Sequence, residues 1–537
     1  MNKTMMTAVA LMICLSPAWA KKKEAAPPER FPRYKTDGMV PKYNGEPLPN
    51  IVIFLVDDMG VMDTSVAMLT DSKGNPKRYR LNDFNRTPSM ERFAEQGIRF
   101  ETFCAQINCS PSRVSILTGQ NASRHRTTKY IMAPGREKAE GPSDPPDWNK
   151  VGITEEMSIL PQELKAKGYR TIHVGKAHLG KVGTYGANPL NLGFDVNIGG
   201  SARGLPSSYL GEDNYGDGKK NGVSGLEEYH GTDTFLTEAL TLEAKKEVKL
   251  CAEANQPLFL HFSHYAVHSP YMLDKRFAEN YADYEGNDPK ANVAFATLIE
   301  GMDKSLGDML DCFEALGIAE NTLIFFLGDN GTANRGHLPK GKRDNHLIVV
   351  NAAEPLRGGK NNEYDGGTRV PFMAAWAKPD PNNPWQKKMP IAMGKIQTQL
   401  GSINDLYPTI LELVGIPVPA DHVIDGYSLK KRLTGAYDKS VPEEFLAYFP
   451  HKHRRNYVAS LRDGDWRLVY YFIPEQAARM SHYELYNLAD DLAEQNDLSK
   501  TNPEKLSTMV QKLAKELEDD NALYPVLDGK ELRPIIP

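Results

Sequence analysis

A continuous apolar run that ends in two carboxylates constrains this chain more than any other feature of its sequence. Residues 51–56 (IVIFLV) are all apolar, which predicts a strand buried on both faces of a parallel sheet. Asp57 and Asp58 follow at once. Such carboxylates are costly to bury without a neutralising positive charge, and ligands of open α/β sheets bind at the carboxyl ends of strands. The pattern indicates an α/β fold with a charged site at this edge, although a turn or helix N-cap would also explain it.

The same pattern recurs later in the chain. Residues 322–327 (TLIFFL) form a second apolar run, which leads through Gly328 into Asp329 and Asn330. Oxygen-bearing side chains from two strand ends are the ligand type that hard divalent cations prefer. The sequence contains no cysteine–histidine cluster of the zinc type. These residues therefore favour an oxygen-coordinated divalent cation.

A third feature is the stretch 108–119, which begins Asn-Cys-Ser-Pro-Ser-Arg. Pro111 suits the first turn of a helix, because its missing N–H group would have no partner there. Cys109 then lies at the helix start, where free N–H groups and the helix dipole favour negative charge. Arg113 returns to the same side one turn later. From these residues alone, a buried structural cysteine before an ordinary helix is the alternative.

The Cys-x-Pro-Ser-Arg pattern followed by a Leu-Thr-Gly helix resembles the modification signature of the type I sulfatases, within the alkaline phosphatase superfamily. In that family a separate formylglycine-generating enzyme oxidises the cysteine to formylglycine (3-oxoalanine), whose hydrated aldehyde is the nucleophile. The resemblance implies this modification at Cys109 and this maturation enzyme as a partner. It extends over residues 50 to about 520.

Further segments match the same family. Residues 175–180 read Gly-Lys-Ala-His-Leu-Gly, residues 268–270 read His-Ser-Pro, and residues 356–360 read Leu-Arg-Gly-Gly-Lys. Residues 329–331 also match, except that Thr332 then stands where the family has a second glycine. This departure concerns the shape of the loop rather than the ligands.

The resemblance assigns chemistry to these positions. It implies a divalent cation, Ca²⁺ rather than Mg²⁺, bound by Asp57, Asp58, Asp329, Asn330 and the oxygen of modified Cys109. It implies a catalytic set of Cys109, Arg113, Lys176, His178, His268 and Lys360. In the implied mechanism the hydrated aldehyde attacks sulfur with help from Asp329. His268 protonates the departing sugar oxygen, and His178 takes a proton from the second hydroxyl as sulfate leaves.

The expected substrates are sulfated carbohydrates. The candidates for substrate binding are His264, His451 and His453, of which the last two could line a polar rim of the site. The candidates for stacking on sugar faces are Tyr209, Tyr215 and Tyr265. The alternatives are a hydrogen-bonded core histidine for His264 and a solvated basic patch for the other two histidines. General resemblance to gut and marine bacterial sulfatases favours a galactose-type sugar.

Three other functions remain open at this stage. A phosphoester or phosphonate monoester hydrolase of the same superfamily would use the same nucleophile and metal residues, although Lys176, His178 and Lys360 argue against it. A non-catalytic sugar-binding relative would be expected to have lost Cys109, Arg113 or His268, and all are present. A structural calcium-binding protein would need none of the histidines.

The predicted fold is α/β, with a large, mixed, mostly parallel sheet between helices, followed by a small α+β subdomain with an antiparallel sheet. We predict a signal peptide at 1–20, an irregular lead-in at 21–49, a catalytic domain at 50–440 and a C-terminal subdomain at 441–537. The apolar part of the signal is too short to span a bilayer, so we expect no transmembrane segment and export to the periplasm or medium after cleavage near Ala20.

Charge and cysteine content narrow the partners. The formal net charge of −5 over 537 residues gives no basic surplus, so nucleic acid is not an expected partner. Apart from Cys109 and Cys14 in the signal, the cysteines are Cys104, Cys251 and Cys312. This odd, sparse set allows at most one disulfide.

Overall fold

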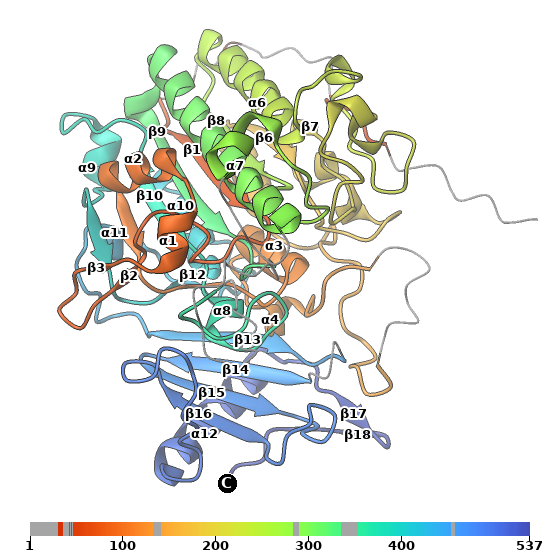
Figure 1. Cartoon of the computed structure of the whole chain (residues 1–537), viewed down its shortest axis with the longest axis vertical. Coiled ribbons are helices and arrows are strands. Elements are labelled where there is room, and N and C mark those ends of the chain that lie inside the picture. Colours follow the sequence, from red (N-terminus) through yellow and green to blue (C-terminus); the bar gives the residue numbers. More distant parts are fainter. Residues whose placement is uncertain are drawn as a thin grey trace, which may run out of the picture.

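The computed structural model describes residues 30–35, 42, 45, 47–132, 141–282, 289–333, 353–452 and 457–537. Its largest element is an eight-stranded sheet (Figure 1). The strands, in spatial order, are β11 (Lys395–Gln397), β4 (Ile98–Phe100), β10 (Phe372–Trp376), β9 (Thr322–Gly328), β1 (Asn50–Val56), β8 (Leu258–Ser263), β6 (Arg170–Gly175) and β7 (Val196–Ile198). Only β10 runs antiparallel to its neighbours. The predicted mixed, mostly parallel sheet is confirmed.

Helices cover both faces of this sheet. One face packs against α2 (Pro88–Gln96), α6 (Leu236–Glu253) and α7 (Pro289–Ala315), and the other against α3 (Cys109–Thr118), α5 (Leu160–Ala166) and α10 (Leu406–Val414). In β1, Val52, Phe54 and Val56 enter the first core, whereas Ile51, Ile53 and Leu55 enter the second. Because strand side chains alternate, a strand covered on both faces has to be apolar throughout.

A second sheet follows along the chain and lies below the first in Figure 1. It is antiparallel, in the order β13 (Glu444–Phe449), β14 (Val458–Asp463), β15 (Trp466–Tyr471) and β16 (Tyr483–Asn487). One of its faces packs against α12 (Pro503–Asp519), and the other shares the core of the large sheet. The predicted antiparallel subdomain is confirmed, and the domain bounds at 440 and 441 remain a prediction.

The remaining elements are short. The other strands are β2 (Leu69–Thr70), β3 (Pro76–Lys77), β5 (Phe103–Cys104), β12 (Gly401–Ser402), β17 (Val526–Leu527) and β18 (Lys530–Glu531). The other α-helices are α1 (Arg80–Phe84), α4 (Ala122–His125), α8 (Asp365–Thr368), α9 (Pro384–Lys388) and α11 (Lys430–Leu433). The 3₁₀ helices are η2 (Tyr185–Ala187), η3 (Pro189–Leu192), η4 (Gly211–Gly216), η5 (Glu227–Tyr229), η6 (Lys275–Tyr281), η7 (Ala319–Asn321) and η8 (Ile403–Asp405). Among these short elements, helix α8 lies between the two sheets (Figure 1).

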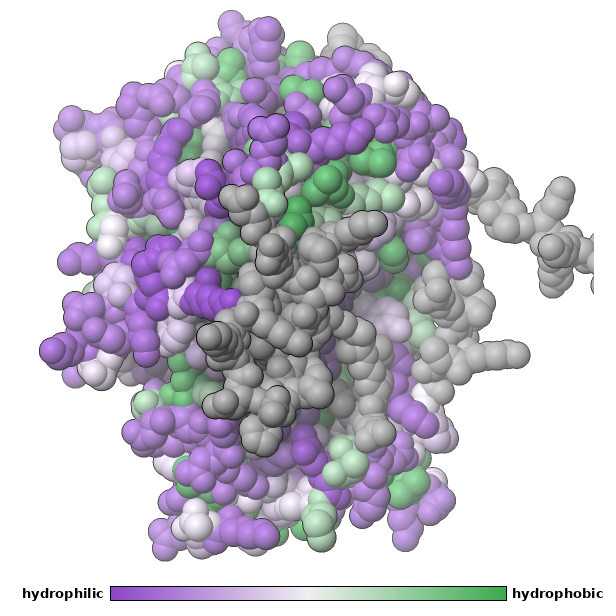
Figure 2. Space-filling model, viewed as in Figure 1, coloured by the Kyte–Doolittle hydropathy of each residue, from purple (hydrophilic) through white to green (hydrophobic). Residues whose placement is uncertain are grey.

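Some sequence-based predictions concern residues that the structure does not describe. The signal peptide at 1–20 and most of the lead-in at 21–49 lie outside them. None of the described helices combines the length and the apolar character that a membrane span requires. Within the described residues, Cys104, Cys109, Cys251 and Cys312 are all free, so the disulfide left open by the sequence is not formed there. On the face seen in Figure 2, the coloured residues are mostly hydrophilic, with hydrophobic residues in small groups.

Candidate active site

The ends of β1 and β9 bring together the two predicted pairs of oxygen-bearing side chains, Asp57–Asp58 and Asp329–Asn330. The two strands are parallel neighbours, with Val56 opposite Gly328, so the residues that follow them meet at the same sheet edge. The backbone N–H of Asp58 donates to Oδ1 of Asp329 at 2.9 Å, and Nδ2 of Asn330 donates to Oδ1 of Asp58 at 2.9 Å. All four side chains are buried. A left-handed backbone at Asp58 (φ 62°) turns the chain at this point.

Helix α3 directs the predicted nucleophile at this edge. Cys109 is the first residue of α3, and its Sγ atom lies with carboxylate oxygens of Asp57 and Asp329 in a group whose atoms are all within 4.8 Å of one another. One turn later, Nε of Arg113 donates to Oδ2 of Asp329 at 2.8 Å. The thiol, the guanidinium and the carboxylates therefore converge as the sequence predicted.

Two lysines complete the ring of charges. Nζ of Lys176, just after β6, lies 2.7 Å from Oδ2 of Asp57, and Nζ of Lys360 lies 2.6 Å from Oδ1 of Asp58. Together with Arg113 and Asp329, these residues make three positive and three negative side chains. With all six groups ionised the site is close to neutral by itself, and a bound divalent cation would give it a positive charge suited to an anionic substrate.

The donor set fits a divalent cation. Oδ1 of Asp57 and Oδ1 of Asn330 are buried and accept no hydrogen bond within the described part of the chain. Burial, with repulsion from Asp329 and Asp58, holds the pKa of Asp57 well above its usual range despite Lys176. A cation would remove that penalty, since it favours the ionised carboxylate. Oxygen donors of this kind suit a hard cation.

The two catalytic histidine candidates lie beside this cluster. Nε2 of His178 donates to the carbonyl of Ile131 at 2.9 Å, which leaves Nδ1 buried, with no hydrogen bond to any described residue. Burial and the nearby Lys176 lower the pKa of His178 to about 3, so the ring is neutral and Nδ1 carries a lone pair. His178 adopts a left-handed conformation (φ 54°), so its side chain leaves the chain after β6 has ended at Gly175.

His268 lies beside Asp58. Its Nδ1 donates to the carbonyl of Ser269 at 2.7 Å, and its Nε2 lies 3.5 Å from Oδ2 of Asp58. Burial lowers the pKa of His268 to about 3, whereas the charge of Asp58 acts to raise it. The negative charge of a bound sulfate ester would act in the same direction as Asp58.

The structure corrects the prediction that His264 binds substrate. His264 has no exposed surface, and its ring packs against Phe54 and Phe262. Its Nε2 atom forms a hydrogen bond of 2.9 Å with Oγ of Ser305 on α7. It follows β8 on the side of the α6–α7 core, so no substrate reaches it. The core alternative for this residue is the correct one.

His451 is corrected in the same way. It is fully buried, its Nε2 lies 2.7 Å from Oγ1 of Thr128, and its Nδ1 lies 3.3 Å from Asp144. It therefore joins the C-terminal subdomain to residues near α4 rather than lining a polar rim. His453 lies outside the described residues. The stacking candidates are also buried, and these are Tyr209, Tyr215 and Tyr265.

Sequence reasoning missed Ser263. Its hydroxyl accepts from Nη1 of Arg113 at 2.6 Å, and the same nitrogen donates to the carbonyl of Lys176 at 2.8 Å. Ser263 is the last residue of β8, the strand between β1 and β6. The strand-end rule that singled out Asp57 would have found it.

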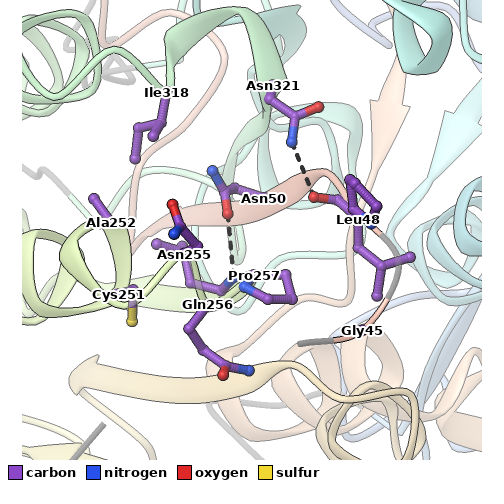
Figure 3. A pocket seen from close by; sticks show the side chains of 12 residues that line it. Gly45, Leu48, Asn50, Cys251, Ala252, Asn255, Gln256, Pro257, Ile318 and Asn321 are labelled. Carbon is purple, nitrogen blue, oxygen red and sulfur yellow. Dashed lines mark hydrogen bonds between the residues drawn. The ribbon is translucent and has the colours of Figure 1, made fainter. Parts of the chain in front are cut away.

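A pocket of about 360 Å³ lies at the opposite ends of the strands, around Asn50, Leu258 and Asn321 (Figure 3). Two of its polar side chains already have partners: Nδ2 of Asn321 donates to the carbonyl of Leu48, and Oδ1 of Asn50 accepts from the N–H of Leu258. These bonds fix strand starts. The pocket is therefore separate from the charged site.

Comparison with known proteins agrees with this geometry. A family model described as Sulfatase matches residues 49–416, and one described as N-sulphoglucosamine sulphohydrolase, C-terminal, matches residues 360–522. The N-acetylgalactosamine-6-sulfatase of Mus musculus is 30% identical over 396 residues, which cover 71% of this chain and 65% of the mouse protein. This chain thus spans slightly less than two thirds of that relative's length.

Two further relatives are similar over most of their length. The N-acetylgalactosamine-6-O-sulfatase of Bacteroides thetaiotaomicron is 25% identical over 549 residues, which cover 89% of this chain and 94% of that protein. The crystal structure of Ps i-CgsB in complex with k-i-k-neocarrahexaose has a TM-score of 0.65 at 23% identity, over 88% of this chain and 93% of that chain. The structural match supports the fold, and the first family model covers more than half of the sequence. This chain belongs to the sulfatase family.

Proposed function

We propose that this protein hydrolyses sulfate esters of carbohydrates, with Cys109 matured to formylglycine and a divalent cation beside it. The observation that carries the proposal is the convergence of Cys109, at the start of α3, with three buried carboxylates and three cationic side chains. A structural cysteine would need none of these neighbours.

Two groups would bring chemistry that the bare chain lacks. Asp57, Asp58, Asp329 and Asn330 would bind the cation, which when bound supplies positive charge that polarises the sulfate group and favours an ionised nucleophile. We propose that this cation is Ca²⁺, as the family resemblance implies, because the donors are carboxylate and amide oxygens. As its hydrate, formylglycine supplies one hydroxyl to attack sulfur and a second whose deprotonation restores the aldehyde as sulfate leaves.

The cationic side chains would bind the sulfate oxygens. Arg113 is held by Asp329, Ser263 and the carbonyl of Lys176, so its guanidinium is fixed before substrate arrives. Lys176 and Lys360 each contact one of the paired carboxylates and flank the same edge. Charges that are already oriented toward developing negative charge lower the barrier without reorganising during the reaction.

The two histidines would move the protons. His268 is fixed through its Nδ1–H group, so Nε2 is the atom that would hold the proton for the departing sugar oxygen once the ring is protonated, a state that the charges of Asp58 and of a bound sulfate ester favour. His178 is fixed through Nε2, and its Nδ1 is the lone pair available to take a proton from the second hydroxyl. Each ring thus has one nitrogen held by a hydrogen bond to a carbonyl and the other available for proton transfer.

The substrate class is supported by the relatives. Two of them are named as N-acetylgalactosamine-6-sulfatases, and a structure with the same fold was solved with a neocarrahexaose. We therefore propose a sulfated sugar of the galactose type. Export through the predicted signal peptide would give the enzyme access to extracellular glycans.

The test is a comparison of kcat/KM on matched aryl sulfate and aryl phosphate esters, followed by a panel of defined sulfated sugars read by released sulfate. We expect a strong preference for the sulfate and turnover of at least one galactose-type sugar. A preference for the phosphate would favour the phosphoester or phosphonate hydrolase. Binding of sulfated sugars without turnover of any ester, in protein with a confirmed aldehyde, would favour the non-catalytic relative.

A further inference from the structure

The segment that carries Lys360, residues 357–369, forms one wall of the candidate active site. The backbone N–H of Lys360 donates to the carbonyl of Thr332 at 2.9 Å, and the N–H of Asn361 donates to the carbonyl of Ile107 at 2.8 Å. The N–H of Gly331 donates to the carbonyl of Gly367 at 3.0 Å. The segment is therefore tied both to the loop that follows Asp329 and to the residues that precede Cys109.

The other side of this segment faces the C-terminal sheet. Asp365 has no exposed surface, and its Oδ1 accepts from Nη1 of Arg462 at 3.1 Å and from Nη2 of Arg467 at 2.6 Å. Arg462 on β14 and Arg467 on β15 are directly opposite each other in the antiparallel pair. Two neighbouring strands thus present their arginines to a single carboxylate of the catalytic domain.

A second carboxylate closes the network. Oε2 of Glu494 accepts from the backbone N–H of Asp365 at 2.9 Å, and Oε1 lies 3.1 Å from Nε of Arg467. At the start of the segment, Nη1 of Arg357 donates to the carbonyl of Glu494 at 2.6 Å. The segment is therefore bound to the C-terminal subdomain at its start and at Asp365.

The charges make the two domains depend on each other here. Like charges directly opposite in a sheet repel, and Arg462 and Arg467 are both buried. Asp365 neutralises them together with Arg369, whose Nη2 lies 2.5 Å from Oδ2 of Asp365. Although burial alone would raise it, the arginines Arg369, Arg462 and Arg467 hold the pKa of Asp365 below its usual range. The carboxylate stays ionised and cannot leave without exposing unpaired buried charges.

We propose that Arg462 and Arg467 are positioning residues, which hold the 357–369 segment through Asp365 and so place Lys360 against Asp58 in the active site. The C-terminal subdomain acts on the chemistry through this contact, without touching substrate at these positions. The inference rests on the proposed function for the role of Lys360 in catalysis, but the contact itself can be tested without activity.

The first test is a double-mutant cycle with Arg467→Lys and Lys360→Met. Lysine keeps the charge but loses the planar fork that binds Asp365, Glu494 and Ser460. We expect Arg467→Lys to lower kcat by about 10- to 100-fold, with a smaller change in KM, since a displaced group costs that much. In the Lys360→Met background it should change kcat less than about twofold, because the group it positions is already gone.

An equal loss of kcat in both backgrounds would mean that Arg467 acts on stability in general, and would overturn the proposal. Arg533→Lys is the matched control, because Arg533 is an exposed arginine of the same subdomain that pairs with Glu531. It should leave kcat unchanged. Arg462→Lys serves as the second variant if Arg467→Lys does not fold, and the same cycle is expected from it.

The second test is independent of sulfatase activity. Hydrogen–deuterium exchange of the whole protein should become faster across residues 357–369 in Arg467→Lys or Arg462→Lys, at a temperature where thermal unfolding of the variant is absent. Unchanged exchange in this segment would overturn the proposal. If wild-type protein with a confirmed aldehyde hydrolyses no sulfate ester, the proposed function fails while this measurement still decides the contact.

Discussion

Nζ of Lys176 lies 2.7 Å from Oδ2 of Asp57, and neither side chain has any exposed surface. The two residues follow β6 and β1, which are separated in the sheet by β8. Their contact closes the site over the end of β8, where Ser263 binds Arg113. The three carboxylates and the three positively charged side chains of the site balance when all are ionised. The added charge of a bound metal ion would therefore prepare this site for an anion.

Removal of the metal should abolish activity and lower the melting temperature. A ligand that binds only the folded state stabilises it by about 2.7 kcal/mol when present at 100 times its Kd. Chelation followed by differential scanning calorimetry measures this loss, and added Ca²⁺ should restore it. Asp57→Ala should lose both the response to Ca²⁺ and the activity. Full activity and an unchanged melting temperature after chelation would remove the metal from the site.

Cys109 should carry an aldehyde when the protein is produced with a formylglycine-generating enzyme. Mass spectrometry of the peptide that contains residue 109, with and without an aldehyde-reactive probe, measures the modification. Cys109→Ala should be inactive but folded, because alanine is a better helix former than cysteine and suits the first position of α3. Cys104→Ala is the control, since Cys104 is buried beside β12 and lies outside the charged cluster. Full activity with an unmodified thiol would contradict the proposed nucleophile.

Lys360→Met should lower kcat by about 100- to 1,000-fold, the usual loss when one oriented group that stabilises transition-state charge is removed. Its Nζ contacts Asp58 and approaches the edge where sulfate would bind. Steady-state kinetics on the preferred ester measure the loss. The control is Lys304→Met, because Lys304 is a surface lysine that pairs with Asp308 one helical turn away. A loss confined to KM would mean that Lys360 binds substrate without acting in the transition state.

His264→Phe should make the fold less sensitive to acid. Burial lowers the pKa of His264 to about 3, so the folded state keeps it neutral while the unfolded state binds a proton below about pH 6.5. The unfolded state then holds more protons, and stability falls as the pH drops from about 6.5 toward 3. One such histidine contributes up to ~1.4 kcal/mol per pH unit in this window.

In His264→Phe the titratable ring is absent, so the unfolded state no longer binds this extra proton. Ser305 keeps its hydrogen bond to Thr241. Urea unfolding at several pH values should therefore show a shallower decline for His264→Phe than for wild type. The KM for the preferred sugar should be unchanged, since His264 lies in the core. An identical pH slope would show that His264 is charged in the folded protein.

Much of the fold follows from local pattern. The runs 51–56 and 322–327 predicted the two central strands. Helix α2 begins at Pro88 and has Gly97 as its C-cap, which are also local signals. Strand Phe372–Trp376, which runs antiparallel inside the sheet, was not predicted. An apolar strand reads the same in either direction, so its orientation depends on which neighbours it pairs with.

For the site, the sequence by itself determined which chemically active side chains the chain has, and that they stand at the ends of strands or at the start of a helix. Asp57, Asp58, Cys109, Asp329 and Asn330 were singled out in this way, because strand ends and helix starts are local properties, and the family resemblance then gave them their expected roles. Tertiary structure alone decided that His264 and His451 are buried, that His178 turns out of the strand, and that Asp365 joins Arg462 and Arg467. Those outcomes depend on which distant surfaces pack together, and burial and charge pairing across a fold are not local properties of the chain.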